Sequence, residues 1–463
     1  MRDVIIVGGG LAGLSAAWRL RHTDALLLEA DDRVGGRVHS ERRGAHWLNW
    51  GGHVYAGGDS ATSWLLDSTG VDSAEVPGSL SGLSMNGRLL TRGRVETYPL
   101  RVPMSWNDRL HMARAGIKVR AAVARYAKVL KRRPGEDDAG RQQRIYDFMN
   151  DRSFADFVGE LPPDAKALFE PTVTRSSANL DQIAAGAGIG YFSLVWNIGG
   201  GLNRNILGGP STLTESIAAA LGDRVQLGAA VHEVVQRDGS VVVRYHQDGR
   251  DHEVQARAVV LATQAHVTHR IAVDLDRDLR EALSRIEYGP FVSAAFLTGE
   301  TTPRRWDDSY AIATPKRSFS VVLNMSNVVH GYGSERIPGS SLMTFSPANQ
   351  ARALLDLDDD DILRRYTEDL SAVLPGFAGT LTEAHVRRWP QGSPYSFPGR
   401  GLLQPALTRR RGGRVFLAGD YLGTLYTETA VRTGLTAAQN VRSVLADTAA
   451  SAPTSPDALT SAF

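Results

Sequence analysis

The sequence contains no cysteine, which excludes disulfide bonds, thiol nucleophiles and thiolate metal sites. It also has no run of 18 apolar residues, so no membrane-spanning helix is predicted. Charge of neither sign dominates, because 52 lysines and arginines face 50 aspartates and glutamates. This balance gives no reason to expect a nucleic-acid partner. Histidines and acids do not cluster at metal-ligand spacing, so we predict no metal site.

The start of the chain lacks a charged segment followed by an apolar one, so we expect no secretory signal and a cytoplasmic location. With 463 residues, the chain exceeds the size of one ordinary hydrophobic core, and two domains are expected. Residues 447–463 are rich in Ala, Ser, Thr and Pro and are predicted to form a disordered tail. Four acids, Asp358–Asp361, precede a helical pattern, and we interpret them as a helix N-terminus.

The first 29 residues follow the pattern of a dinucleotide-binding strand, turn and helix. The β-branched run Val4–Val7 is followed by a G-x-G-x-x-G turn, and Glu29 ends the next apolar run. Gly8 permits the tight turn, Gly10 allows the backbone to approach a pyrophosphate, and Gly13 permits close packing of helix and strand. The helix N-terminus would face the phosphates, and the acid would bind ribose hydroxyls. The predicted contacts are Gly8, Gly10, Leu11, Ala12, Gly13 and Glu29.

The string Glu29–Arg37 indicates which dinucleotide is bound. It has the form E-A-x-x-R-x-G-G-R. This string resembles the N-terminal FAD motif of flavin amine oxidases, protoporphyrinogen oxidases, phytoene desaturases and UDP-galactopyranose mutases. The resemblance implies that Ala30 contacts FAD, that Gly35 and Gly36 let the backbone pass beside it, and that Arg37 reaches its phosphate side. With no cysteine in the chain, the FAD would be held without a cysteinyl bond.

Two further segments resemble this superfamily. The loop with Gly51, Gly52 and His53 corresponds to one that runs under the flavin ring. The strands near Val231 and before Thr263 resemble the second segment of the FAD domain, in which the Val231 backbone would meet the adenine. Sequence alone leaves three roles open for His53, namely a base, a flavin contact or a packed core histidine.

The C-terminal part carries the matching half of the FAD site. An apolar strand ends in Gly419-Asp420, and a helix follows. By resemblance, Asp420 would accept hydrogen bonds from the ribityl hydroxyls. The start of that helix would direct N–H groups at the flavin O2 and so stabilise negative charge on the reduced ring. The predicted contacts are Gly419, Asp420, Thr429, Ala430 and Val431.

The substrate side carries a weaker signal. Flavin monoamine oxidases have two tyrosines in front of the flavin, and by resemblance these are Tyr395, which follows Trp389, and Tyr426. Together with His53, they are our candidate catalytic residues. The alternative is that both tyrosines are core aromatics. The strand 288–295 lacks the lysine that many amine oxidases place there, and Lys316, the nearest lysine, is not a convincing replacement.

We therefore predict an α/β fold in which a Rossmann-type FAD-binding domain is interleaved with a substrate domain of mixed sheet and helices. The FAD-binding domain would comprise 1–85, 205–285 and 385–446, and the substrate domain 86–204 and 286–384. The basic amphipathic stretch 109–133 is either a solvated helix face or a peripheral membrane contact.

The expected activity is that of an FAD-dependent oxidoreductase in a biosynthetic pathway. It would take a hydride from a C–N, C–O or CH–CH bond of a small organic substrate, and molecular oxygen would reoxidise the flavin. Two alternatives stay open, since a fold constrains chemistry only loosely. One is a non-redox isomerase resembling UDP-galactopyranose mutase, and the other is a non-catalytic FAD-binding protein.

Overall fold

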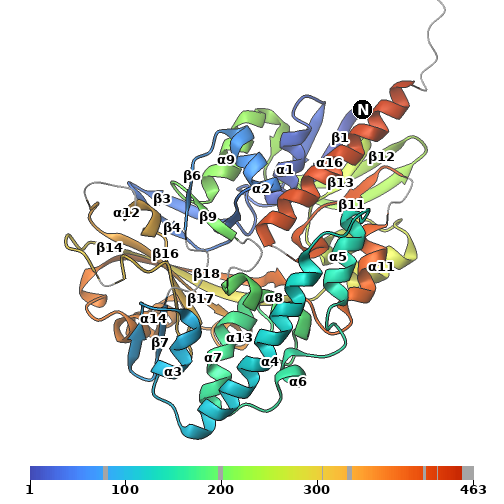
Figure 1. Cartoon of the computed structure of the whole chain (residues 1–463). Coiled ribbons are helices and arrows are strands. Elements are labelled where there is room, and N and C mark those ends of the chain that lie inside the picture. Colours follow the sequence, from blue (N-terminus) through green and yellow to red (C-terminus); the bar gives the residue numbers. More distant parts are fainter. Residues whose placement is uncertain are drawn as a thin grey trace, which may run out of the picture.

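The structure is a computed structural model that describes residues 1–76, 82–196, 202–304, 306–330, 336–409, 413–424 and 426–450, with the backbone alone for 447–450. Two seven-stranded sheets and a layer of helices make up most of the molecule (Figure 1). The predicted α/β fold is confirmed.

The first sheet contains both ends of the chain. Its strand order is β10-β2-β1-β13-β12-β11, with β19 paired to β13. The pairs β1–β2, β1–β13, β2–β10 and β13–β19 are parallel, whereas β12 is antiparallel to both of its neighbours. The strands are β1 (Arg2–Val7), β2 (Ala25–Leu28), β10 (Val225–Gln226), β11 (Ala230–Arg237), β12 (Ser240–Gln247), β13 (Arg250–Leu261) and β19 (Val415–Leu417).

Helices cover both faces of this sheet, which explains the continuous apolar run of β1. Val4 and Ile6 face one core, and Ile5 and Val7 face the other, because successive strand residues point to opposite faces. The first core includes residues of α1 (Leu11–Arg19), α2 (Ala61–Thr69), α9 (Ser211–Leu221) and α16 (Tyr426–Ala450). The second includes residues of α10 (Ala265–Ile271), α11 (Arg277–Ser284) and α15 (Gln404–Thr408).

The second sheet is mostly antiparallel. Its order is β18-β14-β17-β16-β15-β7-β8, and helix α14 (Asp359–Val373) packs on it. Its strands are β7 (Gly82–Met85), β8 (Arg88–Leu90), β14 (Tyr288–Thr298), β15 (Ala311–Ala313), β16 (Val321–Asn324), β17 (Ser340–Pro347) and β18 (Leu381–Pro394). Helix α14 begins as predicted, because the Asp358 side chain accepts a 2.7 Å hydrogen bond from the Asp361 N–H.

A helical layer lies beside this sheet (Figure 1). It consists of α3 (Tyr98–Arg101), α4 (Trp106–Leu130), α5 (Asp138–Asp147), α6 (Phe154–Val158), α7 (Pro163–Val173) and α8 (Ala185–Val195). Helix α8 packs closely, since a Cβ on Gly186 would lie 1.7 Å from the Phe148 carbonyl oxygen. The smaller elements are β3 (Ser40–Arg43), β4 (His46–Asn49), β5 (Tyr55–Ala56), β6 (Ser73–Glu75), β9 (Leu202–Ile206), α12 (Asn327–His330) and α13 (Ala348–Arg352).

The last described helix extends into the segment expected to form a tail. Helix α16 continues to Ala450, which includes residues 447–450 of that segment. The Leu445 carbonyl accepts a 3.0 Å hydrogen bond from Arg257, and alanines favour helix, which together extend α16. The rest of the predicted tail, 451–463, lies outside the described residues. Among the described residues, no helix is both long and apolar enough to cross a membrane.

Candidate active site

The glycine turn after β1 is shaped by close backbone packing. Gly8 has a φ of +104°, and a Cβ on it would lie 2.9 Å from the Ala262 carbonyl oxygen. A Cβ on Gly13 would lie 1.9 Å from the Gly8 oxygen, so helix α1 can approach β1 only with glycine there. A Cβ on Gly10 would meet nothing within 4 Å. Beside that open space, α1 starts at Leu11 with no side-chain cap, so its first N–H groups can bind an anion.

Glu29 lies at the end of β2, against this turn. Its carboxylate accepts hydrogen bonds from the Gly9 N–H and, at 2.9 Å, from the Asp31 N–H. Burial raises the pKa of Glu29, and these backbone donors partly offset the effect. Its backbone carbonyl accepts from the Ala229 N–H at 2.8 Å, which places the start of β11, the strand that contains Val231, next to the Glu29 backbone.

The remaining residues predicted for this region lie close by. A Cβ on Gly8 would lie 3.3 Å from the Thr263 nitrogen. Ala30 is exposed, next to Glu29. The Gly35 N–H donates to the Gly9 carbonyl at 2.8 Å, and a Cβ on Gly36 would lie 3.5 Å from the Gly10 Cα. The two glycine stretches of the N-terminal motif therefore meet around the open space.

Arg37 joins the two ends of the chain. It donates a 2.8 Å hydrogen bond to the Asp420 carboxylate and a 3.2 Å bond to the Gly392 carbonyl at the end of β18. Burial lowers the pKa of Arg37, but attraction to Asp420 outweighs this and leaves the pKa raised. Arg37 and Asp420 were assigned to different parts of the cofactor from sequence, and here they contact each other.

The loop with Gly51 and Gly52 packs between Arg37 and the start of α16. A Cβ on Gly51 would lie 2.2 Å from the Arg37 carbonyl oxygen, and the Gly52 N–H donates to that oxygen at 3.0 Å. The Thr427 hydroxyl donates to the Val54 carbonyl at 2.7 Å. His53 is thus held beside the first turn of α16.

His53 presents an unpartnered nitrogen. Its Nδ1 lies 3.0 Å from the Gly51 carbonyl oxygen, which can only accept, so Nδ1 carries the proton and Nε2 the lone pair. Nε2 is shielded from solvent and has no hydrogen-bond partner among the described residues. Burial, assisted by the positive charge of Arg175, lowers the pKa of His53 to about 4. The imidazole is therefore a neutral acceptor at pH 7.

The start of α16 closes the site from the C-terminal side. Thr429 and Val431 are buried and Ala430 is partly exposed. The Gly419 N–H donates to the Thr433 hydroxyl at 3.0 Å, which fixes the end of β19 against this helix. A Cβ on Gly434 would lie 2.1 Å from the Ala12 carbonyl oxygen, so α16 lies directly on α1 (Figure 1).

Sequence analysis gave Glu428 no role, although it is buried in this region. Its carboxylate accepts hydrogen bonds from the N–H groups of Ala61 and Thr62, each at 3.0 Å. It thereby caps helix α2 from a position more than 360 residues further along the chain. An acid in the first turn of the last helix is visible in the sequence, but its partner could not be predicted from the sequence.

A cavity of about 420 Å³ lies between helices α4, α5 and α8 and the C-terminal motif. Tyr426 and Asp420 line it, as do the neighbours of Tyr395, Pro394 and Ser396. Tyr395 itself is absent from the lining, and its hydroxyl donates to the Glu287 carboxylate. Burial, followed by this hydrogen bond, raises the pKa of Tyr395. The structure therefore brings Tyr426 to the cavity, whereas neither Tyr395 nor His53 is among the residues that line it.

The ring that faces Tyr426 comes from α8. Tyr191 and Tyr426 stack with their centroids 6.1 Å apart and their planes 18° from parallel. The Tyr426 hydroxyl is shielded from solvent. The positive charge of Arg175 acts to lower the pKa of both tyrosines as well as that of His53. No motif marks Tyr191 or Arg175, so sequence analysis missed both.

A family model of flavin containing amine oxidoreductases matches residues 11–442. The chain belongs to this family. It is 24% identical to flavin-containing amine oxidase A of Canis lupus familiaris, over 96% of this chain and 86% of that protein. It is 25% identical to a flavin-containing amine oxidase of Danio rerio, over 95% and 85%.

Solved structures of amine oxidases share the fold. Putrescine oxidase bound to putrescine matches with a TM-score of 0.74 at 21% identity, over 96% of this chain and 99% of that one. Cyclohexylamine oxidase from Brevibacterium oxydans IH-35A matches with a TM-score of 0.73 at 18% identity, over the same shares. The predicted superfamily is confirmed, and the relatives named here are all amine oxidases.

Family membership makes this flavin amine oxidoreductase an FAD-dependent enzyme. The residues present fit that cofactor. A Cβ on Gly10 would have no neighbour within 4 Å, so there is open space beside this residue. The first turn of α1 has no side-chain cap, so its N–H groups are available to a pyrophosphate. The chain has no cysteine, so the cofactor has no cysteinyl bond.

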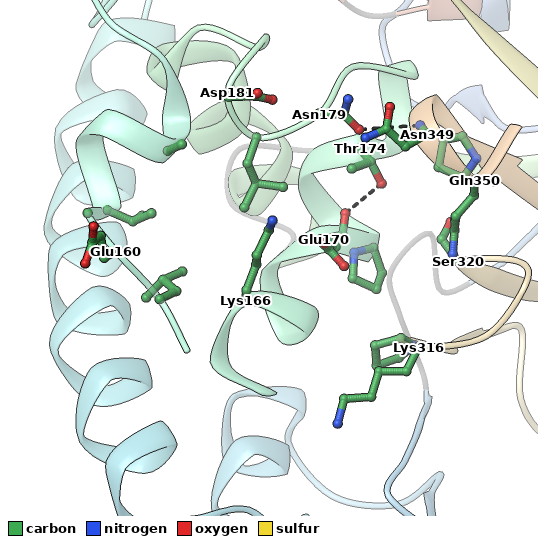
Figure 2. Close-up of a pocket in the computed structure, with 18 residues that line it drawn as sticks. Glu160, Lys166, Glu170, Thr174, Asn179, Asp181, Lys316, Ser320, Asn349 and Gln350 are labelled. Atoms are coloured by element: carbon green, nitrogen blue, oxygen red, sulfur yellow. Dashed lines mark hydrogen bonds between the residues drawn. The ribbon is translucent and has the colours of Figure 1, made fainter. Parts of the chain in front are cut away.

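A second cavity, of about 540 Å³, lies apart from this site (Figure 2). Lys166 and Glu170 of α7 and the loop with Lys316 contribute to its lining, and it shares no lining residue with the first cavity. Lys316 forms an ion pair with Asp164 and donates to Asn86 at 3.0 Å. It therefore does not replace the lysine that β14 lacks. Among the described residues, no group of three His, Asp or Glu could hold a metal ion.

Proposed function

We propose that this enzyme oxidises the carbon–nitrogen bond of a small amine. The overall reaction is R2CH–NH2 + O2 → R2C=NH + H2O2, with molecular oxygen as the final acceptor. FAD, when bound, supplies the acceptor for the hydride that leaves carbon. The protein holds the amine, excludes water and keeps the amine nitrogen unprotonated.

Three groups of residues would hold the cofactor. Gly10, Gly36 and the first turn of α1 would face the pyrophosphate, supported by the open space at Gly10. Glu29 would bind ribose hydroxyls, since its oxygens keep lone pairs beyond the two backbone bonds that they accept. Asp420, oriented by Arg37, would contact the ribityl chain, and Ala430 in the first turn of α16 would face the ring.

The observation that carries the proposal is the match to the amine oxidoreductase family, since every relative named above is an amine oxidase. His53 does not line the cavity and its unpartnered Nε2 is covered by protein, so an amine N–H reaches this nitrogen only if the covering atoms move. Burial and the charge of Arg175 keep His53 neutral, and the same two effects disfavour an ammonium group beside it. We infer that substrate binding uncovers Nε2, which would then accept a hydrogen bond from the neutral amine.

The test is anaerobic reduction of the flavin, followed near 450 nm, with panels of amines, tetrapyrroles, polyenes and aminosugars. We expect bleaching by amines, formation of H2O2 in air, and about 10-fold or greater loss of kcat/KM in His53→Gln with flavin content unchanged. Bleaching by polyenes or tetrapyrroles alone would contradict the proposal. Turnover of an aminosugar only after reduction by dithionite, with no net redox change, would instead favour a flavin-dependent isomerase.

Two tyrosine variants form a matched pair. Tyr426 lines the cavity and stacks on Tyr191, so Tyr426→Leu should lower kcat/KM by about 10-fold through loss of the ring contact. Tyr395 does not line the cavity and donates its hydroxyl hydrogen bond to Glu287, so Tyr395→Phe should leave the kinetics unchanged. Equal losses of kcat/KM in both variants would contradict this distinction and favour the expectation from sequence that both tyrosines lie in front of the flavin.

We further infer the domain division from the sheets. The first sheet and its helices would form the FAD-binding domain, and the second sheet with the helical layer would form the substrate domain. Two strands adjust the bounds drawn from sequence. β7 lies within 1–85 and β18 spans residue 385, yet both pair in the second sheet.

A further inference from the structure

Helices α3 and α4 expose large apolar side chains to solvent. On α4, Trp106 is 87%, Leu110 50% and Ile117 71% exposed, and Leu100 of α3 is 73% exposed. Scattered single apolar residues are normal on a protein surface, but four on two consecutive helices are not scattered. We call Leu100, Trp106, Leu110 and Ile117 the apolar stripe.

The three members on α4 are aligned. At about 100° of rotation per residue, Trp106, Leu110 and Ile117 fall within about 40° of one another on the helix surface. The opposite face of α4 is buried in the helical core, through Ala115, Val119 and Val123. At 1.5 Å per residue, the stripe from Trp106 to Ile117 runs for about 16 Å along the N-terminal half of α4.

Cations flank the stripe. Five exposed basic residues lie on α4, and none forms an ion pair with another described residue: Arg114, Lys118, Arg120, Arg125 and Lys128. Arg114, Lys118 and Arg125 fall on one side of the stripe and Arg120 on the other. The acid on α4, Asp108, is buried and accepts hydrogen bonds from the N–H groups of Asp164 and Ala165. The face is therefore apolar along its centre and positive along its edges.

We propose that the α3–α4 face docks on an anionic lipid surface. The apolar stripe would enter the headgroup region, with Trp106 at one end, and the flanking cations would meet lipid phosphates. A second copy of this chain fits less well, because a two-fold interface places the same patch on both sides and would set these cations against one another. This docking is independent of the substrate, so it can hold or fail separately from the proposed amine oxidation.

The experiment is co-sedimentation of the full-length, FAD-loaded protein with vesicles of phosphatidylcholine alone or mixed with 30% phosphatidylglycerol. We expect pelleting with the anionic vesicles and little with the neutral ones. Arg114→Gln combined with Lys118→Gln should weaken partitioning about 30-fold. Trp106→Ser combined with Ile117→Ser should weaken it about 10-fold or more.

Matched controls lie elsewhere on the surface. Leu402→Ser removes a leucine that is 80% exposed, and Arg277→Gln with Arg285→Gln makes the same change in net charge at α11. Both should bind vesicles like the parent protein, and visible flavin absorbance verifies folding of every variant. Equal pelleting of α4 variants and parent would overturn the proposal. So would a concentration-dependent dimer, seen by light scattering, that the α4 variants abolish.

Discussion

His53 makes the stability of the protein sensitive to acid in a way that can be calculated. Its pKa is about 4 in the folded protein, against 6.5 for an ordinary histidine. Between these values the unfolded chain binds a proton that the folded protein does not bind. The free energy of unfolding therefore falls as the pH falls through this window. Above about pH 7, His53 is neutral in both states and causes no loss of stability.

The size of the effect follows from the two pKa values. At pH 4.5, keeping His53 neutral in the folded protein lowers the free energy of unfolding by about 2.5 kcal/mol. His53 as a whole residue is only partly buried, although its Nε2 is shielded, so we reduce this to about 2 kcal/mol. For a domain of roughly 200 residues, such a loss corresponds to about 4–8 °C in Tm.

The assay compares parent protein and His53→Gln at pH 7.0 and 4.5, with saturating FAD, by tryptophan and flavin fluorescence during heating. The variant lacks the titrating group, so its Tm should fall less between the two pH values, by about 4–8 °C. His39, whose pKa burial also lowers, to about 3, remains in both proteins and cancels from the difference. Parallel loss of Tm in the two proteins would show that His53 is not held neutral, and the acceptor role proposed for Nε2 would fail with it.

Two further predictions concern the contact between the ends of the chain. Gly434→Ala should destabilise the protein by about 1–3 kcal/mol, because its Cβ would lie 2.1 Å from an α1 backbone oxygen. Gly116→Ala, in open space on α4, should instead stabilise it by up to about 1 kcal/mol. Thermal unfolding measures both, and equal effects would contradict the close packing at Gly434. In flavin-free protein, Arg37→Met and Asp420→Asn should each cost about 1–3 kcal/mol, and the double variant less than their sum. Additive costs in that double-mutant cycle would show that the pair is not coupled.

The N-terminal motif could be predicted from sequence because its determinants are local. Gly8, Gly13 and Glu29 lie within one strand–turn–helix–strand unit, whose geometry follows from backbone sterics and short connections. The capped start of α14 at Asp358 was predictable for the same reason, since the donor N–H lies three residues away. In both cases the interacting groups are close in sequence.

The substrate side could not be predicted because its determinants are not local. The direction of Tyr395 depends on how β18 ends against the helical layer, and a shift of one residue reverses which side chains face the cavity. Tyr191 reaches Tyr426 only because α8 packs against the start of α16. Glu428 acquires its role from helix α2, which no periodicity connects to it.

The ion pair between Arg37 and Asp420 makes the N-terminal and C-terminal motifs depend on one another, although they lie far apart in the sequence. A partly buried guanidinium without a carboxylate would be costly, so the position of the N-terminal loop depends on β19, which pairs with β13 and leads to Asp420. The close approach of Gly434 in α16 to the Ala12 carbonyl in α1 makes the two ends of the chain depend on each other in the same way. The space beside Gly10 is thus formed by the whole chain and not by its first 37 residues, although those residues alone were enough to indicate what it holds.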